Sequence, residues 1–272
     1  MTPTPSPTAS SWRFIEVQRE GAVEWLTLAR PEHFNSLNLG LTEELYHYFG
    51  SLPDRIDVRV VVLRGAGRHF CAGYDLDDVD QLTVSLDQGL RLQRQLSAVV
   101  LRMRRCPQPI VGLLHGAACG GGFALALGCD VRFAAPNTRM NVAMAKVGLT
   151  GCDMGISYFL PRAVGPAVAA ELMYTGRFVK AERALRIGLV NDVVAEEQLT
   201  ETAQELVQEM LAMSPAGLRL TKDGLTLAQE TSNLATVMAL EDRGQTLCFA
   251  AFMPEGVAAF REKRAPNYGS GQ

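Results

Sequence analysis

The sequence predicts an α/β core followed by a helical appendage, and three observations support this fold class. Short β-branched runs such as Val58–Leu63 are separated by stretches with helical periodicity as far as Val194. Small-residue, glycine-rich loops follow two of the predicted strands. From about Glu197 to Phe260 only helical periodicity remains. Strands that alternate with helices are typical of an α/β layer, so the helical remainder is expected to form a region of its own.

A β-hairpin opens the predicted fold. Phe14–Arg19 and Val23–Ala29 are rich in β-forming residues, and Glu20-Gly21 between them indicates a tight turn. Arg30-Pro31 ends the hairpin. The later expected elements are a helix with Leu41, Leu45, Tyr48, Phe49 and Leu52 on one face, a strand Val58–Leu63, a helix from Leu86 to Met103, a strand Ile110–Leu114, a helix in Phe123–Gly128, a strand Val131–Ala134, helices in Gly155–Gly165, Ala167–Tyr174 and Lys180–Ile187, and a strand Val190–Val194.

The bulk composition excludes several classes of protein. A chain of 272 residues with 47% hydrophobic and 20% charged residues is ordinary for a globular protein with a large core. A net charge of -3 provides no basic field for nucleic acid or an anionic membrane, and we expect neither as a partner. The six cysteines show no metal-ligand spacing, so no metal is expected. No secretory signal is visible, and a cytoplasmic protein is predicted.

The domain boundaries follow from the same patterns. Residues 1–11 contain a Pro/Ser/Thr tract that cannot pack, and they are expected to form a disordered tail. Residues 12–214 are assigned to the α/β core, and residues 215–272 to the C-terminal helical region.

Two small-residue loops are the candidate site of chemistry. The first is Phe70-Cys71-Ala72-Gly73-Tyr74-Asp75-Leu76, and the second is His115-Gly116-Ala117-Ala118-Cys119-Gly120-Gly121-Gly122-Phe123-Ala124. Glycine allows a ligand to approach the backbone closely, and a helix N-terminus presents unpaired N–H groups. Two such loops side by side suit an oxygen that becomes negative during a reaction. Tight turns and close helix–strand packing explain the same glycines equally well.

These motifs together resemble the enoyl-CoA hydratase/isomerase (crotonase) family. The resemblance is carried in order by Arg30-Pro31 with Asn35, Gly65-Ala66-Gly67, FCAGYDL, HGAACGGGFALALGCD, Thr175-Gly176 and Gly188-Leu189-Val190. It spans about Trp12 to Tyr268 and implies a spiral of ββα units (the ClpP/crotonase-like fold). It also implies a C-terminal helical region that assembles homotrimers, often homohexamers.

The resemblance also implies roles for particular residues. The backbone N–H groups of Tyr74 and Gly121 correspond to the family's two oxyanion donors. Coenzyme A, which arrives as part of the thioester substrate rather than as a separate cofactor, is expected against Glu32, His33, Phe34, Ala72, Gly73, Asp75, Leu76 and Gly120, with Lys263, Arg261 and Arg264 near its phosphates. The three basic residues equally suit an ordinary solvated helix end.

The sequence departs from the family at both catalytic glutamates. Their positions are Ala124 and Met144, and neither side chain can transfer a proton. Asp153 resembles the extra aspartate of the dienoyl-CoA isomerase branch, if one residue is inserted before it. Asp153 also precedes a predicted helix, where aspartate is a standard N-cap. A carboxylate in an apolar acyl pocket is expected to have a raised pKa.

These residues predict enoyl-CoA hydratase/isomerase-type chemistry through a thioester enolate, with Asp153 as the single acid/base. One carboxylate fits isomerisation better than hydration, because it can take a proton and return it elsewhere. Two alternatives remain open. The first is an acyl-CoA-binding protein with little catalysis, and the second is another enolate reaction such as thioester hydrolysis or decarboxylation.

Overall fold

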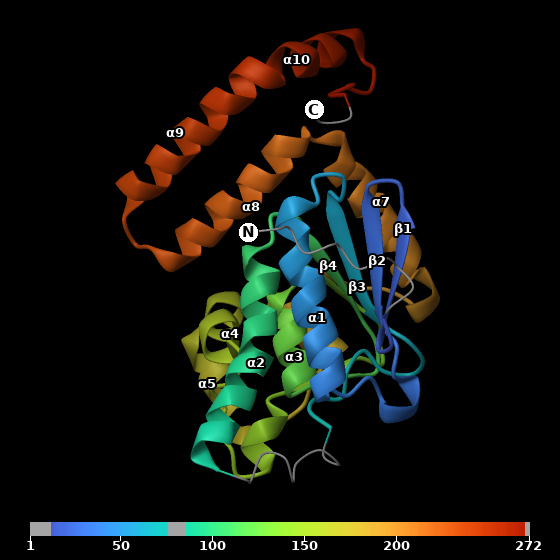
Figure 1. The fold of residues 1–272 in the computed structure, drawn as a ribbon, viewed down its shortest axis with the longest axis vertical. Helices are drawn as coiled ribbons and strands as arrows, with labels where there is room; N and C mark the ends of the chain where they lie inside the picture. The colour runs from blue at the N-terminus through green and yellow to red at the C-terminus, as the bar shows by residue number, and fades with distance from the viewer. Residues whose placement is uncertain (1–11, 76–84, 270–272) are drawn as a thin grey trace, which may run out of the picture.

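Residues 12–75 and 85–269 are described by a computed structural model of the chain (Figure 1). The predicted tail 1–11 and the candidate residue Leu76 lie outside the described residues.

A six-stranded sheet forms the centre of the core. Its strands are β1 (Ile15–Glu20), β2 (Val23–Leu28), β3 (Val60–Gly65), β4 (Ile110–Leu114), β6 (Val131–Ala134) and β9 (Asp192–Val193), in the spatial order β1-β2-β3-β4-β6-β9. Only the β1–β2 hairpin is antiparallel, and the other neighbours are parallel. The predicted hairpin and the strands of β4 and β6 are confirmed, because each is a compact run bounded by turn residues.

Helices cover both faces of this sheet. The core helices are α1 (Leu39–Ser51), α2 (Leu86–Arg105), α3 (Gly121–Gly128), α4 (Ile156–Val164), α5 (Pro166–Thr175), α6 (Ala181–Arg186) and α7 (Leu199–Ala212), of which α4 packs on α3 and α5 packs on α4 rather than on the sheet. Alternate side chains of β3 point to opposite faces: Val61 packs with α1, α2 and α3, whereas Val62 packs with α7. Figure 1 shows the same division, with α1, α2 and α3 on one side of the strands and α7 on the other.

A small second sheet was missed by the sequence analysis. It contains β5 (Ala117–Cys119), β7 (Arg139–Asn141) and β8 (Val179–Lys180), in the order β5-β7-β8. Strands of two or three residues leave no periodic signal, so only the tertiary pairing reveals them. This sheet supports the second glycine-rich loop, since β5 is part of that loop.

The C-terminal helices extend from the core as an arm. They are α8 (Pro215–Glu230), α9 (Leu234–Ala251) and α10 (Met253–Glu262), and the expected helical remainder is confirmed. Figure 1 shows α9 and α10 lying beyond α8, at the far end of the molecule from the start of α2. None of the helices among the described residues is long and apolar enough to cross a membrane.

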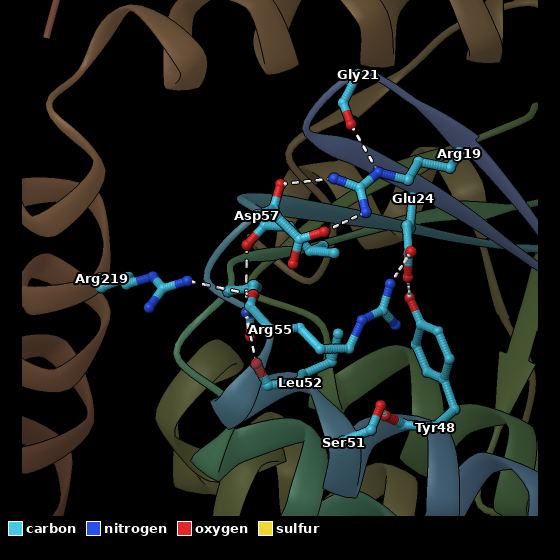
Figure 2. A network of polar contacts seen from close by, with 11 residues as sticks. Arg19, Gly21, Glu24, Tyr48, Ser51, Leu52, Arg55, Asp57 and Arg219 are labelled. Carbon is cyan, nitrogen blue, oxygen red and sulfur yellow. Dashed lines mark hydrogen bonds and ion pairs between the residues drawn. The ribbon is translucent and has the colours of Figure 1, made fainter. Parts of the chain in front are cut away.

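A polar network ties α8 to the core (Figure 2). Glu24 on β2 is 2% exposed and accepts hydrogen bonds from the Tyr48 hydroxyl, at 2.9 Å, and from the Arg55 guanidinium. The Arg55 carbonyl accepts a hydrogen bond from Arg219 on α8, at 3.3 Å. Burial raises the pKa of Tyr48 well above its usual value, with a further rise from the Glu24 carboxylate. The hairpin, the end of α1 and α8 are therefore joined by one set of contacts.

Candidate functional site

The two glycine-rich loops lie against each other. The Cys71 N–H donates to the Ala117 carbonyl at 2.9 Å, and the Cys119 N–H donates to the Cys71 carbonyl at 3.0 Å. A Cβ at Gly73 would lie 3.1 Å from the Cys119 carbonyl oxygen, so only glycine fits without displacing the neighbouring backbone. The side-by-side arrangement on which the sequence analysis depended is therefore present.

Glycines also shape the start of α3. Gly120 has φ of +53°, in the region that favours glycine, and Gly121 is the first residue of the helix. A Cβ at Gly122 would lie 2.2 Å from the Cys71 carbonyl oxygen, which explains the third glycine. The first N–H groups of a helix have no intrahelical acceptor. Among the described residues no acceptor is bonded to the Gly121 N–H, which leaves this donor available beside the loop that carries Tyr74.

A third segment, 34–37, holds the first loop from its other side. The Ala72 N–H donates to the Phe34 carbonyl at 3.1 Å, and the Leu37 N–H donates to the Gly73 carbonyl at 2.7 Å. The Asp75 N–H then donates back to the Leu37 carbonyl at 2.8 Å. The predicted coenzyme A contacts from the 32–34 turn and from the first loop are thus brought together. Leu37 was missed, although its position just after the Arg30-Pro31 turn is visible in the sequence.

An ion pair fixes the end of the first loop. Arg30 Nη2 lies 2.9 Å from Asp75 Oδ2, and both side chains are nearly buried. The other Arg30 nitrogen, Nη1, donates to the Ser36 carbonyl. His33 Nδ1 approaches the same Asp75 oxygen at 3.9 Å. This carboxylate therefore holds the loop in place, and Glu32 beside His33 is exposed.

Asn35 organises the turn that carries these contacts. It is fully buried, and its side chain donates to the carbonyls of Ala66 and His69, at 2.8 and 2.7 Å. Its Oδ1 accepts the Arg30 N–H at 2.9 Å. Phe34 and Asn35 both have φ of +55°, an uncommon conformation that asparagine tolerates better than most residues. In the sequence Asn35 is visible only as part of the family resemblance, and nothing there indicates this role.

Lys263 is not brought to the loops within one chain. It is the exposed C-cap residue of α10, on the arm. Its neighbour Arg264 forms ion pairs with Glu255 and Glu262, with nitrogen–oxygen distances of 2.6 to 3.0 Å. A role for Lys263 at the loops of its own chain is therefore not supported by this arrangement.

The two positions that the resemblance assigns to the family's glutamates are apolar and buried. Ala124 lies on α3 with no exposed surface, and Met144 is 7% exposed in the 3₁₀ helix Ala143–Lys146. The Ala143 side chain lies 3.4 Å from the position of a Cβ at Gly120, so this short helix borders the second loop. We call these two buried apolar residues, Ala124 and Met144, the apolar wall beside the α3 N-terminus.

Asp153 lies next to this wall. Its neighbour Met154 is buried, and Met154 Sδ is 3.4 Å from the position of a Cβ at Gly121. The Asp153 carboxylate accepts a hydrogen bond from Gln93 on α2. The alternative N-cap role is wrong, because Gly155 is the N-cap of α4 and no side chain caps that helix. Only the Asp153 backbone carbonyl takes part, accepting the Ile156 N–H at 2.8 Å.

Burial raises the pKa of the Asp153 carboxyl above its ordinary value. The hydrogen bonds from Gln93 and from the Met154 backbone oppose this rise without cancelling it. Burial also raises the pKa of Cys71 to about 12 and that of Cys119 to about 11, so both remain neutral thiols near pH 7. Asp153 is thus better suited to proton transfer here than either cysteine is to nucleophilic attack.

Comparisons with known proteins agree with this geometry. The sequence model of the enoyl-CoA hydratase/isomerase family matches residues 18–271. A probable enoyl-CoA hydratase of Mycobacterium bovis is 39% identical over 89% of this chain and 87% of its own length. The 1,2-epoxyphenylacetyl-CoA isomerase of Escherichia coli is 37% identical over 94% of this chain and 98% of its own.

Solved structures give the same result. The crystal structure of an enoyl-CoA hydratase from Bacillus anthracis superimposes with a TM-score of 0.89 at 31% identity, covering 95% of this chain and 100% of that one. With a family match over nearly the whole chain, relatives above 30% identity and the matching fold, the chain belongs to the enoyl-CoA hydratase/isomerase (crotonase) family.

Proposed function

We propose that this protein is an enoyl-CoA isomerase-type enzyme that moves a double bond in a coenzyme A thioester, with Asp153 as its single acid/base. The observation that carries the proposal is the pairing of an apolar wall at Ala124 and Met144 with a carboxyl of raised pKa at Asp153. Hydration by two glutamates needs proton-transfer groups at the positions of both Ala124 and Met144. Isomerisation needs only one group, because the proton removed from one carbon returns to another.

In this proposal the thioester carbonyl oxygen accepts hydrogen bonds from the Tyr74 and Gly121 N–H groups. The contact between the two loops and the glycine-only geometry of Gly73 and Gly122 support it. Both donors belong to the backbone and lie at fixed positions, and Gly121 adds the positive end of α3. Such preorganised donors stabilise the negative oxygen of an enolate more than the neutral carbonyl.

Asp153 then acts as the proton shuttle. Its carboxylate removes the proton on one carbon of the acyl chain, the electron pair moves into the enolate, and the resulting carboxylic acid returns the proton at another carbon. A raised pKa makes the carboxylate a stronger base than a solvated aspartate. Gln93 on α2 holds its orientation. No cofactor beyond the coenzyme A of the substrate is required by these steps.

The similarity to the Escherichia coli 1,2-epoxyphenylacetyl-CoA isomerase is compatible with an isomerase, and the similarity to the probable enoyl-CoA hydratase of Mycobacterium bovis is compatible with a hydratase, so the choice between them depends on the residues of the site. We further propose that the exposed apolar side chains of α9 and α10 mediate a homotrimer or homohexamer, in which Lys263 meets the coenzyme A phosphates of a neighbouring chain. Leu234, Leu247 and Phe260 are 71%, 62% and 86% exposed, which supports a partner for this arm.

The test is turnover of a panel of enoyl- and dienoyl-CoA thioesters by the wild-type protein and by Asp153→Asn, with a parallel acyl-CoA binding titration. We expect the substitution to lower kcat by roughly 10²- to 10⁴-fold, the usual contribution of a general acid/base, while binding is retained. Gln95→Glu, on the same helix as Gln93, provides a control that leaves Asp153 and its partner in place.

Each other outcome identifies an alternative. Equal turnover by both proteins would remove Asp153 from the mechanism. Tight binding without turnover of any substrate would favour an acyl-CoA-binding protein. Release of carbon dioxide from a malonyl-type thioester, or of free coenzyme A, would identify decarboxylation or hydrolysis instead.

A further inference from the structure

A second concave site lies between the core and α8, at the opposite end of α3 from Gly121. It is a cavity of about 190 Å³. Three of its wall residues are arginines from three different elements: Arg104 on α2, Arg132 on β6 and Arg162 on α4. Apolar walls and the polar residues Asp130 and Gln229 complete it. Neither glycine-rich loop contributes a wall residue, so this cavity is separate from the proposed active site.

The oxygens that accept hydrogen bonds from the guanidinium groups around the cavity are mostly neutral. Arg104 Nη2 donates to the Gln229 side-chain oxygen at 2.8 Å. Arg132 Nε donates to the Leu189 carbonyl at 2.8 Å. Arg162 Nη1 donates to the Tyr158 carbonyl at 2.8 Å. Carbonyl and amide oxygens orient these guanidinium groups, but they leave the formal charges in place.

Asp130 is the only carboxylate among the wall residues that the structure describes, and its charge is already neutralised. Asp130 Oδ2 lies 2.9 Å from the buried ammonium of Lys222 and also accepts the Ile110 N–H at 2.8 Å. Its second oxygen lies 3.5 Å from Arg104 Nη1, a longer contact. No carboxylate among the described residues lies within 4.0 Å of a charged nitrogen of Arg132 or Arg162. Once the Lys222–Asp130 pair is counted as neutral, three positive charges remain around one cavity.

The burial of Arg132 points to the same conclusion. Burial lowers the pKa of the Arg132 guanidinium, so its surroundings disfavour the positive charge. An anion in the cavity offsets this cost, since guanidinium groups bind oxyanions with charge-assisted hydrogen bonds.

We propose that this cavity between α2, α4, β6 and α8 is a binding site for a compact oxyanion, either phosphate or a small carboxylate. A water molecule takes up about 30 Å³ of liquid, so the cavity has room for an anion of several heavy atoms. The site joins the core to the first helix of the arm, through Arg104 and Gln229. Anion binding therefore strengthens this junction.

The test is thermal unfolding and isothermal titration of the full-length protein with inorganic phosphate, acetate or chloride at matched ionic strength. We expect a saturable rise in Tm with phosphate or acetate, of about 3 °C near ten times the Kd, and a smaller, unsaturated response to chloride. Comparing phosphate with acetate shows which oxyanion geometry the site prefers. No saturable response to either oxyanion beyond that of chloride would overturn the proposal.

Variants locate the response. Arg104→Gln and Arg162→Gln should each weaken the oxyanion affinity roughly tenfold, because each removes a charge-assisted contact. The charge-conserving Arg162→Lys should lose less. Arg105→Gln, on the exposed side of the same helix, should bind as the wild type does. Arg104→Gln is also expected to lower the stability of the protein without the anion. The rise in Tm on adding the oxyanion is therefore compared between variants, rather than the absolute Tm. An oxyanion-induced rise in Tm that is unchanged in both glutamine variants would show that the anion binds elsewhere and would overturn the proposal.

Discussion

Helices α2 and α9 have nearly the same length but opposite surroundings. The 20-residue α2 buries Leu92, Leu96, Val99, Val100 and Met103 against the core. The 18-residue α9 has no buried residue. Periodicity predicted a helix from Leu86 to Met103 and a helical region from about Glu197 to Phe260, but burial depends on whether another surface lies opposite. The core is thus complete within one chain, whereas the arm presents an apolar face, and α8 links the two through Lys222 and Arg219.

A pair of glycine substitutions should separate the two regions most strongly. Gly122→Ala places a Cβ 2.2 Å from the Cys71 carbonyl oxygen, and the backbone must move to admit it. We expect a loss of about 4 kcal/mol or more in the free energy of unfolding, together with loss of acyl-CoA binding. Gly244→Ala on α9 meets only Leu220, at 3.7 Å, and should gain about 0.5–1 kcal/mol from higher helix propensity. Urea titration measures both, and similar losses at both positions would refute the contrast.

Removal of the buried ammonium at the junction should be nearly as costly. Lys222→Met leaves Asp130 without its nearest cation and leaves the Gln108 carbonyl with only the weak Cys106 thiol as a donor. We expect a loss of about 3–5 kcal/mol, the usual cost of breaking a buried pair. Arg243→Met on the exposed surface of α9 serves as the control and should stay within about 0.5 kcal/mol. Chemical denaturation measures the free energy of unfolding of both variants. An unchanged midpoint for Lys222→Met would show that the Lys222–Asp130 pair does not anchor α8.

Two leucines test the same contrast without charges. Leu96 on α2 is 5% exposed, and Leu96→Ala should cost about 2–5 kcal/mol through lost packing and the cavity left behind. Leu247 on α9 is 62% exposed, and Leu247→Ala should change the unfolding free energy of the dissociated chain by no more than about 0.5 kcal/mol. The Leu247 variant should instead weaken self-association in analytical ultracentrifugation. A large loss of stability in the dilute Leu247 variant would show that the arm packs within its own chain.

The smallest expected effect concerns Asp153 and pH. Its pKa is raised in the folded state, so the folded protein binds this proton more tightly than the unfolded chain does. Stability from this group is therefore full below the ordinary pKa of 3.8 and is lost as the pH rises through the folded pKa. Asp153→Asn removes that loss, so its Tm should exceed the wild-type value by at most a few degrees at pH 8, with a smaller difference at pH 4.5. A difference that does not vary with pH would mean that the carboxyl has an ordinary pKa.

Local patterns were sufficient for most of the secondary structure. The β1–β2 hairpin, β4 and β6 match their predicted segments closely, and α1 and α2 were predicted from their apolar spacing, whereas the helices after Glu197 were predicted only as one helical region. The strands β5, β7 and β8 were not, because two or three residues carry no periodic signal and their pairing joins segments distant in sequence.

The candidate site divides in the same way. Sequence identified both glycine-rich loops, and it identified Asp153 as an acid in a small-residue loop. It left the N-cap alternative open, because an aspartate before a helix looks the same whether or not its side chain caps that helix. The partners of Asn35 and Asp75 could not be inferred, since Ala66 and Arg30 reach them only through the folded chain.

The sequence by itself determined the α/β class, the order of the longer core elements, the family, and the presence of Ala124 and Met144 at the positions that the resemblance assigns to glutamates. These depend on local residue types and their spacing, which the chain carries before it folds. Only the tertiary structure decided that Gly73 and Cys119 touch, that Gln93 bonds Asp153, and that three arginines surround one cavity. Such contacts join residues far apart in the chain, so their geometry exists only after packing has brought the elements together.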